Sequence, residues 1–196
     1  MNTESAIATI IAATKDPSLG LPDQVFYYIS QTTPLINVDL LIRDENGRVL
    51  LSWRDDQHTG RGWHLPGGIV RFKETIARRI AKVAKTEIGT AVDFDAHPVA
   101  IHQMIHKSRD IRGHFISFLY NCFLAGDFVP ANIGLFPGNA GFLAWHEICP
   151  HDLLPVHNVY RQYIDPLSSA DAGSGDESVY ISPVILSERG SIHADC

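Results

Sequence analysis

The sequence is poor in cysteine, in positive charge and in long apolar runs. Its three cysteines have no spacing typical of a zinc or redox site, and so few thiols in 196 residues indicate a reduced, cytoplasmic protein. The net charge of −6 argues against nucleic acid as a partner. The apolar run at residues 6–13 is too short to cross a membrane, and the chain lacks the basic start of a signal peptide. We therefore expect no nucleic acid and no membrane partner, whereas a nucleotide needs only a few local cations.

The pattern along the chain predicts one α/β domain between two flanking segments. Residues 1–30 are predicted to form a helical leader, punctuated by prolines. Residues 31–165 form the main domain, which is long enough to bury its own core. Residues 166–196 have the Ser-, Gly- and Asp-rich composition of a linker, with one apolar stretch at 179–186 that predicts a short strand.

Within the main domain, periodicity and turn signals predict a succession of strands and helices. Alternating apolar residues predict strands at 36–42, 48–52, 63–66, 99–106, 114–124 and 142–145. Apolar residues spaced along one face predict a helix at 75–88, and Pro155 is expected to separate two short helices at 150–154 and 156–164. The polar stretch 54–62 and the charged stretch 107–112 are expected to be loops.

The most informative motif spans residues 68–89. Its frame consists of Gly68, Glu74 after five residues, and then Lys82, Glu87 and Gly89. This spacing resembles the Nudix box, in which a helix clusters carboxylates that hold divalent cations on phosphate oxygens. The box pattern is altered at three positions, which here are Lys82, Val83 and Thr86. Glu87 is thus the one carboxylate left at the metal positions of the box, and the resemblance implies a Nudix fold, a mixed β-sheet sandwiched between α-helices.

Four further segments resemble one branch of the Nudix superfamily, the GDP-mannose mannosyl hydrolases. They are residues 33–40 with 50–54, residues 62–68, and residues 155–163. The resemblance implies an enzyme that cleaves the C–O bond of a nucleoside diphosphate sugar, with Mg²⁺ or Mn²⁺ as cofactor and as a homodimer. Water attacks the anomeric carbon with inversion, so one cation on the leaving diphosphate suffices and a general base must face the sugar.

The resemblance also implies the roles of individual residues. His114, at the start of a predicted strand, matches the catalytic histidine, and imidazole suits a general base because it exchanges a proton near neutral pH. Glu87 is the expected metal ligand, and Gly67 would add its backbone carbonyl. Glu74 is expected to cap the helix and to pair with Lys82.

The remaining candidates are expected to bind substrate. Arg54 would hold the diphosphate, because a guanidinium matches its oxygens bidentately. The family's second arginine is replaced by Ile69, and Arg71, two residues further on, is expected to substitute for it. Asp39 and Gln103 are expected to line the same cleft. Two further departures from the family, Gly113 beside the expected base and Met104 at an expected sugar contact, bear on substrate specificity.

Two alternatives to this function stay open. An ordinary Nudix pyrophosphatase would release a nucleoside monophosphate, but Val83 and Thr86 remove two of its carboxylates. A non-catalytic module that binds nucleotide sugars is favoured by Ile69 and Gly113. The products formed from GDP-mannose with Mg²⁺ would distinguish the sugar hydrolase, the pyrophosphatase and the non-catalytic module.

Overall fold

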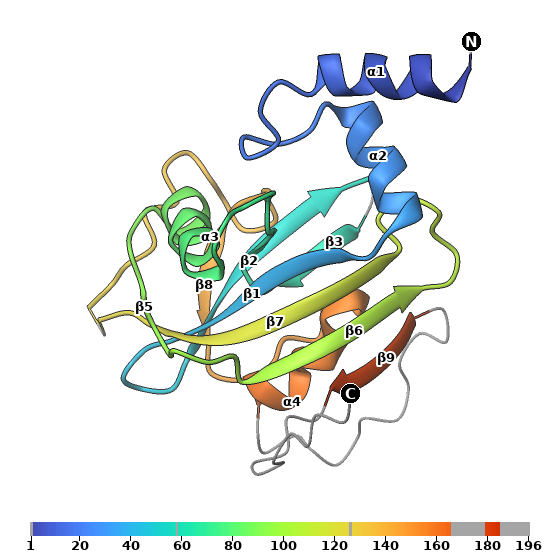
Figure 1. The fold of residues 1–196 in the computed structure, drawn as a ribbon. Helices are drawn as coiled ribbons and strands as arrows, with labels where there is room; N and C mark the ends of the chain where they lie inside the picture. The colour runs from blue at the N-terminus through green and yellow to red at the C-terminus, as the bar shows by residue number, and fades with distance from the viewer. Residues whose placement is uncertain (1, 58, 126, 166–178, 185–196) are drawn as a thin grey trace, which may run out of the picture.

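A twisted mixed sheet with helices on both faces forms the body of the molecule (Figure 1). The computed structural model describes residues 2–57, 59–125, 127–165 and 179–184. Nine strands form the sheet: β1 (Leu35–Arg43), β2 (Val49–Asp56), β3 (Gly60–His64), β4 (Gly67–Ile69), β5 (Asp93–Phe94), β6 (Ala100–His106), β7 (His114–Phe123), β8 (Leu143–His146) and β9 (Val179–Val184). The predicted fold class, a mixed sheet between helices, is confirmed.

The sheet order places β1 and β7 at its centre. The order runs β3-β2-β1-β7-β6-β9, with β4 paired to β1, β5 to β7 and β8 to β2. The β1–β7 pair is parallel and aligns Asn37 with Ser117, whereas the other pairs are antiparallel. Because side chains alternate between the two faces of a strand, this register decides which residues of β1, β6 and β7 can share a site.

One face of the sheet packs against helix α3 (Ile76–Val83) and the π-helical turn η1 (Ala84–Ile88). The Thr75 side chain caps the start of α3 by accepting a hydrogen bond from the Arg78 N–H, and Gly89 ends η1 with a φ of 87°. The core on this face contains Val38, Leu40, Ile42, Ile80, Val83, Ile88, Tyr120 and Cys122. This packing fixes the turn that carries Glu87 against the sheet.

The opposite face packs against the 3₁₀ helix η2 (Pro155–Tyr160) and helix α4 (Arg161–Ile164). Its core contains Leu41, Leu51, Leu65, Leu119, Leu153, Tyr160 and Ile164. Pro155 begins η2 instead of separating two helices, since proline is tolerated in the first turn, where no backbone N–H is needed. The predicted helix at 150–154 is therefore wrong, and these residues form a turn and a bridge to Trp63.

The flanking segments lie at opposite sides of the body (Figure 1). Helices α1 (Thr3–Ala13) and α2 (Asp23–Thr32) precede the sheet, and α1 buries none of its residues. Of the predicted tail, residues 179–184 form β9, which pairs antiparallel with β6, while residues 166–178 and 185–196 lie outside the described residues. In the described part of the chain, no helix has the length and apolar character needed to cross a membrane.

The stretch 54–62, expected to be a loop, instead extends two strands. Strand β2 continues to Asp56 and β3 begins at Gly60, so that Arg54 pairs with Gly62 across the ladder. These residues are polar or charged and show no apolar alternation, so periodicity does not predict their strands. Arg54 is consequently held by a strand and not by a flexible connection.

Candidate active site

A cavity of about 160 Å³ opens beside β1, β2 and the end of β6. Its cationic side chains are Arg54, Arg109 and Arg112. Asp39 is the only carboxylate among the described residues that line it. The lining therefore has more positive than negative side chains, although the net charge of the chain is −6. This local excess of positive charge attracts an anion to the cavity.

Asp39 lies at the floor of the cavity and is held in one orientation. It is 3% exposed, and its Oδ2 accepts hydrogen bonds from the Tyr160 hydroxyl at 2.6 Å and from the Ser117 hydroxyl. Burial, and then the neighbouring Asp39, raises the pKa of Tyr160 well above its ordinary value, so this hydroxyl keeps the proton that it donates. The Oδ2 of this buried aspartate is therefore hydrogen-bonded, as the position of Asp39 in an apolar strand requires.

Gly67 packs directly against this carboxylate. A Cβ at position 67 would lie 2.3 Å from Asp39 Oδ1 and 2.8 Å from the Val38 carbonyl oxygen. No side chain fits there, so position 67 requires glycine because the neighbouring strand lies so close, and not because the backbone turns. The Gly67 N–H donates to Glu87, which brings the strand β4 backbone and the end of the α3–η1 helix together at the cavity.

Glu87 occupies the π-helical turn, with its carboxylate 29% exposed. Burial raises its pKa to about 7, against the opposing effects of Arg54 and of the Gly67 N–H. The nearest basic side chain that pairs with it is His64, whose Nε2 lies 4.0 Å from Glu87 Oε2. Burial lowers the pKa of His64 well below its ordinary value, and so this imidazole is neutral and adds no positive charge in contact with the carboxylate.

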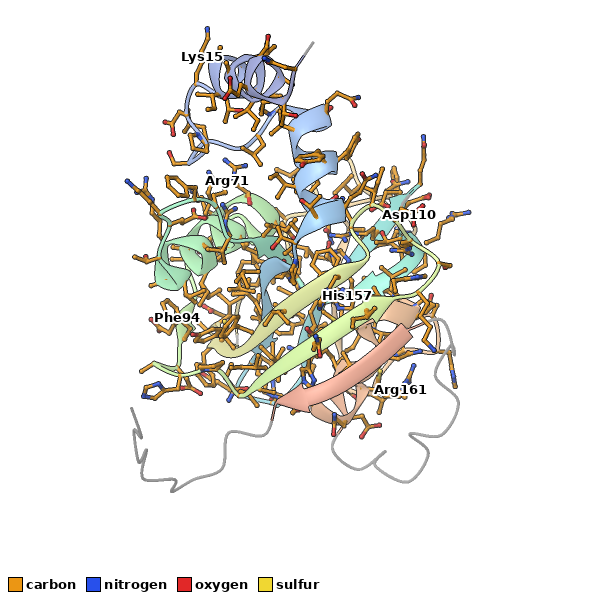
Figure 2. All side chains as sticks on the ribbon, turned by 45° about the vertical axis from the view of Figure 1, so that its right-hand side comes forward. Lys15, Arg71, Phe94, Asp110, His157 and Arg161 are labelled. Atoms are coloured by element: carbon orange, nitrogen blue, oxygen red, sulfur yellow. The ribbon has the colours of Figure 1, made fainter. Side chains whose placement is uncertain are left out.

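His157 contributes a second neutral imidazole to the cavity wall. Burial lowers its pKa to about 4, with Asp39 opposing and Arg54 reinforcing the shift. Its Nδ1 is buried and has no hydrogen-bond partner among the described residues. Figure 2 shows His157 beneath the strands of the sheet, where η2 carries it.

The structure does not bring His114 to this cavity. Strand β7 directs Phe115 into it, and the neighbouring His114 therefore points to the opposite face of the sheet. There its Nε2 lies 3.1 Å from Gln103 Nε2, so both expected site residues face away from the cavity, beside α2. The positions of strand β6 that face the cavity are Met104 and His106.

Arg71 also lies away from the cavity. Its Nη1 donates to the Leu19 carbonyl oxygen, which attaches the segment before α2 to the body of the protein. Figure 2 shows Arg71 next to this N-terminal segment and well separated from His157. The expectation that Arg71 replaces the family's arginine at the substrate is thus not met, since the chain turns after Ile69 and the two side chains do not share a strand.

Glu74 is structural, but its partner is not the expected Lys82. Both side chains of the Glu74–Arg79 pair are nearly buried, with Arg79 Nε 2.8 Å from Glu74 Oε2. Glu74 also accepts the Arg71 N–H at 3.0 Å, so it fixes the loop before the helix. Burial of Glu74 raises its pKa, but hydrogen bonds from Arg71 and Arg79 more than offset this, so the pKa is lowered. The charge of Lys82 adds only the smallest of these lowering effects.

Comparisons with known proteins agree with this architecture. A family model for the NUDIX domain matches residues 33–166. The chain belongs to the Nudix family. The "Low-salt glycan biosynthesis protein Agl8" of Haloferax volcanii is 30% identical over 115 residues, which are 57% of this chain and 72% of that protein.

Two solved structures show the same Nudix fold. The MutT protein from Methanosarcina mazei Go1 is 18% identical and superposes with a TM-score of 0.53, covering 69% of this chain and 96% of that one. The MutT NUDIX hydrolase from Burkholderia pseudomallei is 21% identical, with a TM-score of 0.54 and coverage of 66% and 97%. At these identities the likeness concerns the fold alone.

The altered positions of the Nudix box have separate structural consequences. Val83 is 3% exposed and packs in the core under the sheet, while the Thr86 hydroxyl donates back to the Lys82 carbonyl oxygen at 2.8 Å. Within the described residues, no three acidic, histidine or cysteine side chains are grouped as a metal site. Of the metal positions of the box, position 87 is the one that carries a carboxylate.

Sequence reasoning missed the two arginines of the 107–113 loop and His157. Arg109 and Arg112 lie in a stretch that looked like a solvated loop, and only the fold shows that it borders the cavity. Gly113 shapes this loop, because a Cβ there would lie 2.1 Å from the Arg109 carbonyl oxygen. The run of charge in 107–112 was the one available signal.

Proposed function

We propose that this Nudix protein hydrolyses a nucleoside diphosphate sugar of the GDP-mannose type at the sugar C–O bond. The observation that carries the proposal is the cavity with three arginines beside a single box carboxylate, Glu87. Guanidinium groups bind phosphate oxygens bidentately and remain charged at any physiological pH. They therefore stabilise a diphosphate both when it is bound and when it leaves with additional negative charge.

The residues of this site could hold a divalent cation, Mg²⁺ or Mn²⁺, through a single carboxylate. Glu87 carries a carboxylate whose burial is uncompensated by a cationic neighbour in contact, which favours a bound cation there. Glu87 and the Gly67 carbonyl would hold the ion, and substrate oxygens and water would supply the other ligands that Mg²⁺ requires. When bound, it would neutralise charge on the leaving diphosphate.

Two histidines compete for the role of general base. His114 stays the prediction of the family resemblance, but its ring and the cavity are on opposite faces of the sheet. We favour His106, which lines the cavity from the end of β6 and is near Ser108, whose Oγ lies 3.2 Å from His106 Nδ1. An imidazole there is suited to take a proton from water that attacks the anomeric carbon.

The substrate contacts then divide between the two ends of the cavity. Arg54, Arg109 and Arg112 would bind the diphosphate. Asp39 would accept hydrogen bonds from sugar hydroxyls with the oxygen not occupied by Tyr160 and Ser117, and the unpartnered Nδ1 of His157 would accept one as well.

Product analysis tests the proposal. We expect GDP-mannose and Mg²⁺ to yield GDP and free mannose, and hydrolysis in ¹⁸O-labelled water to place the label on the sugar. GMP with mannose phosphate, or label on phosphate, would identify a pyrophosphatase instead. Binding without turnover would identify a non-catalytic module, an alternative favoured by the absence of a three-ligand metal cluster among the described residues.

We also propose that the protein forms a homodimer. Exposed isoleucines on α1, among them Ile7 and Ile11, support a contact with a second copy. Light scattering coupled to gel filtration gives the mass directly, and a monomer at micromolar concentration would contradict the proposal.

A further inference from the structure

The N-terminal helix α2 lies outside the residues that match the Nudix family, yet it touches the loop that carries two cavity arginines. The family match begins at residue 33, and α2 ends at Thr32. Its contacts are with Arg112, which lines the cavity. A segment that the family does not require is therefore in a position to influence how the cavity binds an anion.

The backbone of Arg112 is held by Ser30. The Ser30 hydroxyl accepts the Arg112 N–H at 3.3 Å and donates to the Tyr27 carbonyl oxygen at 2.9 Å, so both of its hydrogen-bonding functions are used. Ser30 is 4% exposed, which shields these bonds from water. A serine with a single possible orientation is a fixed support for the residue that it binds.

The side chain of Arg112 is held by Phe26. The guanidinium carbon lies 6.0 Å from the centroid of the Phe26 ring, within reach of a cation–π interaction. Phe26 and Ser30 are four residues apart, and therefore lie on one face of α2. One helix face thus contacts both the backbone and the side chain of the same arginine.

Arg112 needs such support for two reasons. Its φ of 55° lies in the left-handed region, which is unfavourable for a residue with a Cβ. Its guanidinium is half-buried, and burial and the nearby charges of Arg54 and Arg109 lower its pKa, because the three cations repel one another.

We propose that Phe26 and Ser30 are positioning residues, which keep Arg112 directed into the cavity and so make α2 part of the site for a diphosphate. The inference rests on the proposed function only in the identity of the ligand. A further contact holds α2 in place at its N-terminal end, because Arg71 donates a hydrogen bond to the Leu19 carbonyl oxygen in the segment that leads into the helix. The expected consequence is weaker binding of diphosphates when the helix face is altered.

The test measures binding to the full-length protein and does not need turnover. Calorimetric titration with GDP and with inorganic pyrophosphate, in the presence of Mg²⁺, compares wild type with Phe26→Leu, Ser30→Ala and Arg112→Ala. We expect Arg112→Ala to raise Kd about 10–100-fold for both ligands. Phe26→Leu should raise it about two- to fivefold, the scale of one cation–π contact, and Phe26→Tyr should restore it.

The decisive comparison is a double-mutant cycle. If Phe26 acts through Arg112, Phe26→Leu has no further effect on Kd in the Arg112→Ala protein. Tyr28→Leu is the matched control, because this aromatic residue of the same helix is 57% exposed and should leave Kd unchanged. Additive effects of Phe26→Leu and Arg112→Ala would overturn the inference, as would a loss confined to GDP, which would indicate contact with the nucleoside. Diphosphate binding that obeys the cycle without any hydrolysis would support the inference while rejecting the proposed enzyme.

Discussion

The buried imidazole of His157 should make the protein lose stability in mild acid. Its pKa is about 4 in the folded protein, against an ordinary value of 6.5. The unfolded chain therefore binds a proton in the range between these values that the folded protein excludes. Stability from this group is complete above pH 6.5 and is lost as the pH falls towards 4.

The size of the effect follows from the two pKa values. A difference of about 2.5 units corresponds to at most about 3.4 kcal/mol, of which about 2.5 kcal/mol is lost between pH 7.5 and pH 4.5. The cause is burial: His157 is 8% exposed and lies against the rings of His64 and Tyr160. Glu87 opposes this trend, because its raised pKa stabilises the folded protein below pH 7.

Denaturant unfolding of wild type and His157→Gln at several pH values isolates the contribution of His157 from that of Glu87. We expect the free energies of unfolding of the two proteins to converge by about 2–3 kcal/mol as the pH falls from 7.5 to 4.5. His151→Gln is the matched control, since His151 is an exposed histidine six residues earlier in the sequence, and this change should leave the pH dependence unchanged. Parallel pH profiles for wild type and His157→Gln would refute the reasoning.

Three further predictions concern the proposed reaction. Arg54→Ala should lower kcat/KM by about 30–1000-fold, whereas Arg61→Ala, a 68% exposed arginine on the neighbouring strand, should leave it unchanged; equal effects would contradict the assignment. Glu87→Gln should lower kcat by roughly 10³-fold and abolish the response to added Mg²⁺, and near-normal rates in excess chelator would rule this out. His106→Gln should lower kcat about 10²–10⁴-fold and His114→Gln only a few-fold, and the reverse order would restore His114 as the base.

The sequence was sufficient for most of the strands, for the helix at 75–88 and for the part of the site that local spacing defines. Strands β6 and β7 begin and end within a residue of their predicted bounds, because each has a buried face and clear turn residues around it. Glu87 and Gly67 come together because the box places a helix directly after the strand that carries Gly67. Arg54 and Asp39, which were predicted to bind substrate, both line the cavity.

The failures concern which face of a strand a residue occupies and which distant segment meets it. His114 and Phe115 differ by one position, and only the register between β6 and β7 decides which of them faces the cavity. Arg71 was expected at the substrate because two residues on a strand share a face, but β4 ends at Ile69. Arg112 depends on contacts with a helix 80 residues earlier, which no local pattern reveals.

The burial of Val83 makes the loss of the box carboxylate difficult to reverse. Its side chain packs with Val38, Ile80 and Ile88, and a Cβ on Gly68 would already lie 2.9 Å from its Cγ2. A glutamate restored at position 83 would have to bury a charge in this core or move the helix, and either change costs several kcal/mol before any cation can bind.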